Sequence, residues 1–397
     1  MTDGLYGGFV VHAPASKSTV RGLLARHSAE FPPYNYEREF LLLIGDWYHQ
    51  PAGQVLAWYM SIESFGNEPV PDSLLINGVG NFNCSMAVPA RPVDCIERQT
   101  DLSYLSDIDT PYRIRVVNTG SLGFTLACEN RPLTLIQVDS IDVEPQEASS
   151  AGILYPGQRM DLILPPSKDN LTSLTIHLDQ ETVNYSTTLP APNHTIPITP
   201  SHLPNPLDLQ NTPTKPTLLS PLPKKPSQTH VVYTKIQKLS INHNIPTGFF
   251  NRTSWRPQSN PPGPLTALPR DKWDENQFSL ATGDAEWVDL VVNNLDEGGH
   301  PFHLHGHHFY ILRVYEASIG WGSYNPFVDS DPPGLEPGSG YDLSRAMLRD
   351  TVYIPSRGYA VLRFRADNPG VWMFHCHIVW HSASGMAMLV DVPGNLY

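Results

Sequence analysis

The sequence has few charged residues for its length and no region rich in basic ones. Charged side chains make up 16% of the 397 residues, below the roughly 25% typical of soluble domains. Against 39 acidic residues there are only 26 lysines and arginines, which gives a net charge of −13. Because nucleic-acid binding needs clustered basic residues that neutralise phosphates, DNA and RNA are excluded as partners.

Long apolar runs are also absent. No run approaches the roughly 18 residues that a membrane-spanning helix needs, so we expect no membrane span. The opening residues, Met1 to Gly4, contain no basic and apolar signal region, so no secretion signal is expected in the chain as it stands. Asn-x-Ser/Thr sequons are nevertheless compatible with a secreted glycoprotein, and they lie at Asn83, Asn170, Asn184, Asn193 and Asn251.

Cysteine is scarce, and the four residues are too few for a disulfide scaffold. Cys84 and Cys95 are close enough in sequence to close a short loop through a disulfide. Cys128 is expected to be buried outside any disulfide, the alternative being a pair with a further domain. Cys376 lies among histidines, which indicates a different use.

Proline is in excess, with 39 residues, about twice the usual share. Short β-rich runs recur between turn residues and no heptad pattern is present, which favours an all-β protein of β-sandwiches joined by Pro-rich loops. The apparent strand at Phe9 to His12 has nothing before it to pair with, so residues 1–14 resemble the C-terminal end of a domain. The remainder divides into a connector, an antiparallel sandwich, a Pro-rich linker and a second sandwich, expected at 15–36, 37–185, 186–228 and 229–397.

Half of the 16 histidines fall in two short segments, residues 300–308 and 375–381. Side chains alternate between the two faces of a strand, so His303 and His305 should share one face while Leu304 points to the other. By the same argument His375 and His377 share a face that Cys376 opposes. One strand can therefore serve two metal sites, one on each side.

The Cys376 face collects a distinctive set of ligands. His381 returns after a short loop, Met386 follows five residues later, and His300 can come from the neighbouring segment. Two imidazoles, a thiolate and a thioether are the ligands of a blue-copper electron-transfer centre. A structural zinc site would instead use paired cysteines at fixed spacing, and these are absent. Neighbouring His307 and His308, together with His49, are expected to have structural or hydrogen-bonding roles.

The two segments resemble the third and fourth copper-binding motifs of the multicopper oxidases, particularly the fungal laccase-like and ferroxidase-like branch. Further similarity lies at residues 3–7, 46–49, 75–78 and 156–159, so the resemblance covers nearly the whole chain except the linker. It implies cupredoxin-like Greek-key β-sandwich domains, two of them complete and a preceding one represented only by its tail. It also implies copper as the cofactor.

The resemblance implies a role for each ligand. The type 1 copper would be held by His300, Cys376, His381 and axial Met386. The type 2 copper would use His303, and the type 3 pair would use His305, His375 and His377. Electrons from substrate would then pass through Cys376 to its neighbours His375 and His377, where dioxygen is reduced to water.

Two departures from the family pattern are visible. The family takes half of its type 2 and type 3 histidines from two His-x-His motifs of a first domain, and neither motif is in this sequence. The acidic residue that the family has between Ile and Trp in the last motif is Val379 here. The electron-accepting half is therefore complete, and a complementary first domain is expected as a partner for oxygen reduction.

Three functions remain open. The sequence favours a laccase-like oxidoreductase that takes electrons from phenolic or diphenol substrates, with dioxygen as acceptor, in an extracellular enzyme. The alternative is a ferroxidase, in which Asp296, four residues before His300, would contact ferrous iron and Asp46 would match a second acidic position. The third is a truncated copper-binding product without turnover. Either enzyme would oxidise a small substrate at the type 1 site.

Overall fold

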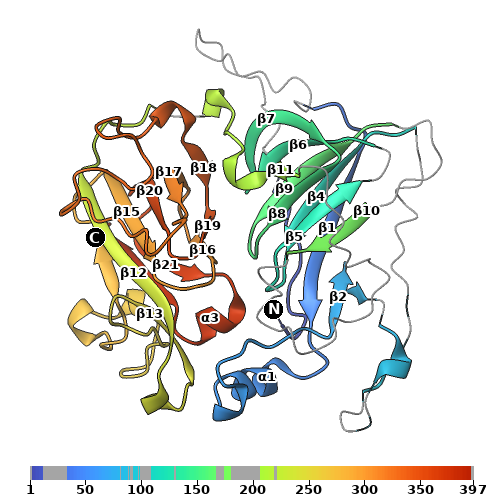
Figure 1. The fold of residues 1–397 in the computed structure, drawn as a ribbon, viewed down its shortest axis with the longest axis horizontal. Helices are drawn as coiled ribbons and strands as arrows, with labels where there is room; N and C mark the ends of the chain where they lie inside the picture. The colour runs from blue at the N-terminus through green and yellow to red at the C-terminus, as the bar shows by residue number, and fades with distance from the viewer. Residues whose placement is uncertain are drawn as a thin grey trace.

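The computed structural model describes residues 2–11, 34–80, 82–87, 89, 93–96, 98, 109–128, 131–166, 174–179, 206–218 and 221–394. Strands dominate these residues and form two lobes that lie side by side (Figure 1). The first lobe contains β1 to β11 and the second contains β12 to β22. Among the described residues, none of the helices combines the length and hydrophobicity needed to cross a membrane. The all-β prediction is confirmed.

In the described part of the first lobe, two sheets enclose a core that includes Ile114, Leu126, Leu135 and Leu162. Leu135 and Leu162 are register partners in adjacent strands. One sheet runs in the order β3 (Val79–Gly80), β2 (Ser73–Ile76), β1 (Arg38–Trp47), β4 (Tyr112–Asn118), β9 (Arg159–Leu164), β6 (Leu133–Val138) and β7 (Ile141–Ala148). The other runs in the order β10 (Leu174–Leu178), β5 (Phe124–Cys128), β8 (Ser150–Leu154) and β11 (Leu207–Asp208).

The second lobe repeats the arrangement and carries the histidine segments on one of its sheets. Its core contains Phe302, Phe309, Phe364 and Phe374. The first sheet runs β13 (Pro246–Phe250), β12 (Gln228–Lys238), β15 (Trp287–Asn294), β20 (Tyr359–Arg365), β17 (Phe309–Tyr315) and β18 (Met347–Arg349). The second runs β14 (Ser279–Ala281), β22 (Ala387–Val392), β21 (Gly370–Cys376), β16 (His300–Leu304) and β19 (Thr351–Ile354).

Helices are short and lie in the connections. Within the described residues the α-helices are α1 (Ala52–Tyr59) and α3 (Val379–Ala383). Single 3₁₀ turns occur at η1 (Ile62–Ser64), η2 (Cys84–Met86), η5 (Leu209–Asn211), η6 (Pro216–Leu218), η7 (Ser240–Asn242), η8 (Leu265–Ala267), η9 (Arg270–Lys272) and η10 (Leu343–Arg345).

The sheets are not purely antiparallel, contrary to the expectation for residues 37–185. Strands β1 and β4 pair in parallel, with Arg38 opposite Tyr112, and β12 pairs with β15 in the same way. A parallel pair cannot be joined by a tight hairpin and needs a long crossover. Here α1 and β2 lie in the chain between β1 and β4, and the sequence pattern of a strand does not reveal such a crossover.

The strand expected at Phe9 to His12 is not formed in the described residues. A turn is present, with the Tyr6 N–H donating to the Gly4 carbonyl at 3.0 Å, but residues 9–11 have no regular structure and Phe9 is exposed. An extended segment gains no ladder hydrogen bonds without a neighbouring strand. His12, most of the connector expected at 15–36, much of the linker and sequons Asn170, Asn184 and Asn193 lie outside the described residues.

The short disulfide loop is confirmed, since Cys84 and Cys95 are joined. The domain boundaries stay a prediction.

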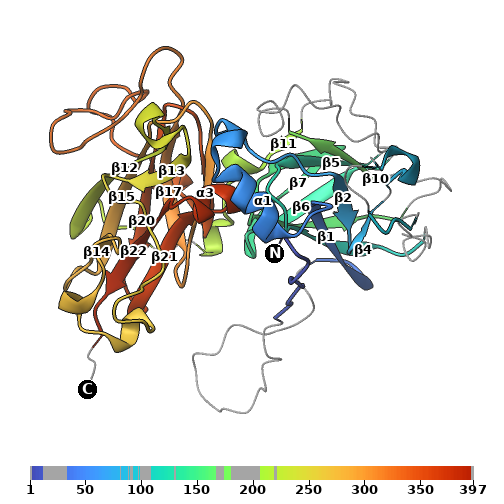
Figure 2. The same cartoon turned by 90° about the horizontal axis from the view of Figure 1, so that it is seen from below.

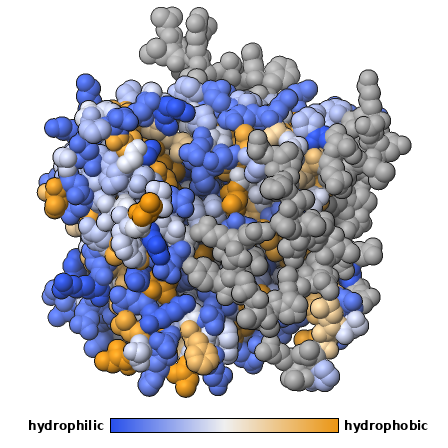
Figure 3. Space-filling view, in the orientation of Figure 1, coloured by the Kyte–Doolittle hydropathy of each residue, from blue (hydrophilic) through white to orange (hydrophobic). Residues whose placement is uncertain are grey.

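Figure 3 shows that the coloured part of one face is mostly hydrophilic, with scattered apolar residues.

The two lobes are joined by apolar packing. Tyr48, which follows β1, and Val55 and Tyr59 of α1 belong to the core of the second lobe. Helix α1 lies beside α3 (Figure 2). The Trp380 indole N–H of α3 donates to the Tyr48 hydroxyl at 3.0 Å. The first lobe therefore reaches directly to the helix that carries His381.

Candidate metal centre

Three predicted ligands converge in the core of the second lobe. His300 begins β16, Cys376 ends β21 and His381 lies on α3, and all three are buried. Cys376 Sγ lies 3.8 Å from His300 Nδ1 and 3.6 Å from His381 Nδ1, and the two Nδ1 atoms are 3.0 Å apart. Met386, also fully buried, precedes β22.

The backbone positions these ligands through local geometry. Strands β16 and β21 are antiparallel, with Phe302 opposite Cys376, so His300 enters close to the end of β21. The chain then turns through α3 and returns, and the loop is closed by two backbone hydrogen bonds. The Met386 N–H donates to the His381 carbonyl at 3.0 Å, and the Cys376 N–H donates to the Met386 carbonyl at 3.1 Å.

The donor set fits a copper ion. Two imidazole nitrogens and one sulfur face each other within 4.8 Å in a buried site, an arrangement typical of blue-copper ligands. Burial raises the pKa of the Cys376 thiol, but the contact with His300 and the charge of His381 outweigh burial and lower it to about 7. A thiolate, the form that binds metal, is therefore accessible near neutral pH.

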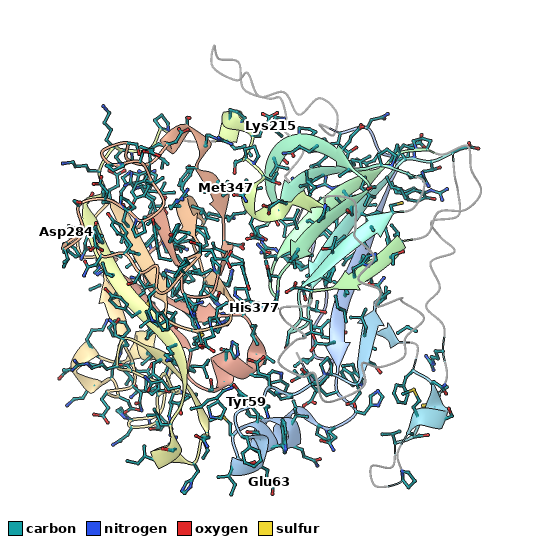
Figure 4. The ribbon with its side chains drawn as sticks, in the orientation of Figure 1. Tyr59, Glu63, Lys215, Asp284, Met347 and His377 are labelled. Carbon is teal, nitrogen blue, oxygen red and sulfur yellow. A yellow bond between two sulfur atoms is a disulfide. The ribbon has the colours of Figure 1, made fainter. Side chains whose placement is uncertain are left out.

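Four further histidines form a separate cluster at the edge of the same sheet, which we call the four-histidine cluster (His303, His305, His375 and His377). Ring centroids of His305 and His375 are 5.2 Å apart, and those of His303 and His377 are 6.1 Å apart. The Nε2 atoms of His305 and His375 lie 3.1 Å apart. Figure 4 shows His377 where the two lobes meet.

Two of these imidazoles are held neutral. Burial and the neighbouring His377 lower the pKa of His375 to about 3, and burial and His303 lower that of His377 to about 4. Neutral imidazole is the form that ligates metal. The His375 Nδ1–H donates to the Cys376 carbonyl at 2.8 Å, which leaves its Nε2 directed at His305. The cluster is thus linked to Cys376 by covalent bonds and by one hydrogen bond.

Two carboxylates contact the outer nitrogens of the His300 and His381 rings. Asp296 Oδ2 lies 3.4 Å from His300 Nε2, and Glu68 Oε1 lies 2.7 Å from His381 Nε2. Both carboxylates line a surface pocket together with Lys238. Asp296 was predicted from the sequence, whereas Glu68 was not. Glu68 lies 313 residues before His381, in a loop of the first lobe with no motif that could have marked it.

Asp46, the second acidic residue suggested by the sequence, is not among the described residues that line this pocket. Its carboxylate accepts a hydrogen bond from the Ser121 backbone N–H. Burial raises the pKa of Asp46, although that bond acts in the opposite direction. Glu68 therefore takes the place proposed for Asp46, because the fold directs Asp46 into the first lobe.

The remaining candidates have structural surroundings. The buried His307 ring packs edge-on against Phe364 and Trp372, while His308 is exposed. His49 Nε2 lies 2.8 Å from Ser73 Oγ. Val379 is the first residue of α3. Cys128 is buried in the core of the first lobe.

Family models described as "Multicopper oxidase" match residues 38–188 and 237–395, and the second match contains every ligand discussed above. The chain belongs to the multicopper oxidase family. Members of this family use copper and pass electrons to oxygen, so the predictions of family and cofactor are confirmed. The assignment of individual ligands stays a prediction.

Curated relatives of this multicopper oxidase include "Iron transport multicopper oxidase FET3" of Gibberella zeae, 31% identical over 98% of the chain and 58% of the relative. "Iron transport multicopper oxidase FET5" of Saccharomyces cerevisiae is 27% identical over 98% of the chain and 61% of the relative. The chain thus spans about 60% of the length of these curated relatives.

Two solved structures share its fold. Fet3p, described as a multicopper oxidase that functions in iron import, has a TM-score of 0.69 at 23% identity, over 92% of this chain and 67% of that structure. The laccase from Botrytis aclada has a TM-score of 0.67 at 22% identity, over 90% and 64%. These similarities confirm the cupredoxin-like sandwich fold and, at such identities, extend to the fold alone.

Replacement of Met386 by leucine is expected to raise the reduction potential of the type 1 copper, because a coordinating axial sulfur stabilises the oxidised ion. Redox titration of the copper-loaded proteins measures the change. Met388→Leu is a matched control, since Met388 is fully buried in the same core cluster as Met386 but is not a predicted copper ligand. An unchanged or lower potential in Met386→Leu would mean that Met386 is not the axial ligand.

Proposed function

We propose that the enzyme containing this chain is a ferroxidase, with ferrous iron as substrate and dioxygen as final electron acceptor. The observation that carries the proposal is the pair of carboxylates, Glu68 and Asp296, on the outer nitrogens of His381 and His300. Both line one surface pocket, so a cation bound by these carboxylates would be separated from each imidazole only by the carboxylate that contacts it. The naming of the curated relatives as iron transport oxidases supports the same conclusion.

The carboxylates have the properties that an iron site needs. Burial opposes ionisation of Asp296, but the contact with His300 outweighs it and lowers the pKa to about 2. Burial likewise opposes ionisation of Glu68, and the charge of His381 outweighs it, so its pKa is also lowered. Both are therefore anionic at neutral pH. Lys238 also lines the pocket and works against a cation there, but the two carboxylates outnumber it.

The residues also provide a short route for the electron. Glu68 Oε1 and His381 Nε2 are 2.7 Å apart, so an ion bound to Glu68 is connected to the ring whose Nδ1 faces Cys376. Copper held by His300, Cys376, His381 and Met386 would supply a one-electron acceptor at that point. From Cys376 the chain leads directly to His375 and His377 in the four-histidine cluster.

Oxidation of phenols, which the sequence alone placed first, remains the second candidate. Asp46 does not favour iron over phenol, because it lies in a motif that the sequence shares with ordinary laccases. A neutral phenol, however, has no need of two carboxylates beside the acceptor. The pocket chemistry therefore supports iron over phenol as the substrate.

The test is a pair of charge-removing variants, Glu68→Gln and Asp296→Asn, in the enzyme with its full set of coppers. Each is expected to lower kcat/KM for Fe²⁺ by roughly tenfold or more, since an interaction with a charged group contributes about 1.5–3 kcal/mol. For an uncharged diphenol, kcat/KM should stay within about twofold, because the phenol does not need the carboxylates. Steady-state oxygen consumption with both donors provides the measurement.

Glu63→Gln is the matched control, because Glu63 is an exposed acid close to Glu68 that does not line the pocket. It should leave both activities unchanged. The visible spectrum of each variant shows whether the type 1 site is intact. Equal losses with Fe²⁺ and diphenol would show that the carboxylates only support the histidines, and the ferroxidase proposal would fail.

A further inference from the structure

Residues 156–159, one of the segments of family similarity in the sequence, form a turn that contributes no proposed metal ligand. It joins β8 to β9 in the first lobe but lies against the second lobe. Tyr155, just before it, stacks on Tyr353 with ring centroids 3.7 Å apart. Gly157 has a φ of +82°, and a Cβ there would overlap the His377 ring. The turn is therefore fitted closely to the four-histidine cluster.

Arg159 of the first lobe makes a bidentate ion pair with Asp350 of the second lobe. Its Nη1 lies 2.7 Å from Asp350 Oδ1 and its Nη2 lies 2.6 Å from Asp350 Oδ2. Nη1 also donates to the Gly157 carbonyl at 3.1 Å and lies 3.4 Å from Asp139 Oδ1. A planar guanidinium held at several points fixes both the position and the orientation of the carboxylate that it binds.

Asp350 in turn is connected to His303. The Thr351 hydroxyl donates to Asp350 Oδ1 at 2.9 Å, so Thr351 Oγ1 can accept a hydrogen bond from another donor. His303 Nδ1 lies 2.9 Å from the Asp350 carbonyl oxygen and 3.1 Å from Thr351 Oγ1. Because a carbonyl oxygen only accepts, His303 Nδ1 must carry the proton. Its Nε2 then has the lone pair that a metal ion needs.

We propose that Arg159 is a positioning residue for His303. Its ion pair with Asp350 holds the carbonyl and hydroxyl that fix the Nδ1–H tautomer of His303, so that docking of the two lobes directs Nε2 toward copper. The inference rests on the proposed role of His303 as a copper ligand and does not depend on whether iron or phenol is the substrate. An ordinary structural ion pair would stabilise the fold without selecting a tautomer.

The first experiment measures the tautomer without metal. NMR spectra of the chain with ¹⁵N-labelled histidine rings distinguish a protonated from an unprotonated ring nitrogen, and His303→Gln assigns the signals of His303. In the unmodified chain, Nδ1 should be protonated and Nε2 unprotonated. Arg159→Met should give a mixture of tautomers at the same pH, and Arg159→Lys, which keeps one charged donor, should restore part of the original state.

The matched control is Arg113→Met. Arg113 is a buried arginine of the same lobe, paired with Asp161 through Nε at 2.8 Å. It should lower thermal stability without changing the His303 signals. If Arg159→Met does not fold, Asp350→Asn serves instead, because it keeps the backbone carbonyl and removes the charge pair. An unchanged His303 tautomer in the folded variant would overturn the proposal.

The second experiment measures copper. In a Cys376→Ser background, which removes the type 1 thiolate, Cu²⁺ binding to the four-histidine cluster is followed by electron paramagnetic resonance. Adding Arg159→Met should weaken that binding by about 10–100-fold, the usual effect of losing a partner that orients a metal ligand, whereas adding Arg113→Met should not. A changed tautomer with unchanged Cu²⁺ affinity would refute the link to the metal, whatever the result for Fe²⁺ oxidation.

Discussion

Replacement of Cys376 by serine is expected to abolish the intense visible absorption of the copper-loaded chain. That absorption arises from charge transfer between a thiolate and copper, and a serine hydroxyl cannot replace the soft sulfur. Cys376 Sγ faces both His300 Nδ1 and His381 Nδ1 in a fully buried site, whereas Cys128 lies in the core of the first lobe. One-electron reduction by a donor should be lost with the band.

The matched control is Cys128→Ser, which removes the other buried thiol from the core of the first lobe. It should keep the visible band, although it is expected to lower stability. Absorption spectra, with copper content by elemental analysis, decide the result. A copper-loaded protein without an intense visible band, or a band that survives in Cys376→Ser, would contradict the type 1 assignment.

A polypeptide of residues 1–397, produced alone, is expected to bind about one copper ion tightly and not to sustain four-electron reduction of dioxygen. The ligands proposed for type 1 copper all lie within residues 300–386 of one lobe. The four-histidine cluster offers only four imidazoles, and His305 is exposed, so several coppers bound there would be open to water. Copper should therefore bind only weakly to the four-histidine cluster.

Elemental analysis for copper and oxygen consumption with a diphenol donor test this expectation together. The supporting result is close to one copper per chain and a protein that a donor reduces once before the reaction stops. Cys376→Ser in the same polypeptide should remove most of the tightly bound copper, which identifies the occupied site. Close to four coppers with continuous oxygen uptake would refute the prediction.

Contacts between the lobes complete both the pocket beside His300 and His381 and the four-histidine cluster. Glu68 of the first lobe contacts His381 of the second, and Arg159 contacts Asp350 in the same manner. A change in lobe docking would therefore alter this pocket and the geometry of the four-histidine cluster together. Residues far from the copper motifs are therefore expected to influence both the pocket and the cluster.

The sequence by itself determined the fold class and predicted a set of copper ligands. Alternation along the chain separates Cys376 from His375 and His377, and the short return through His381 to Met386 places the four proposed type 1 ligands within one lobe. These relations are local, because strand periodicity and loop length restrict them to a few arrangements. The motif resemblance then identified the metal.

Only the tertiary structure decided which acidic residues face the type 1 histidines and how the lobes meet. The sequence pointed to Asp46 and gave no sign of Glu68, yet packing directs Asp46 to the Ser121 backbone and Glu68 to His381. The parallel pairing of β1 with β4 and the ion pair of Arg159 with Asp350 were equally hidden. The physical reason is that such contacts join segments separated by many residues, and their geometry is fixed by the docking of whole sheets, which no local pattern encodes.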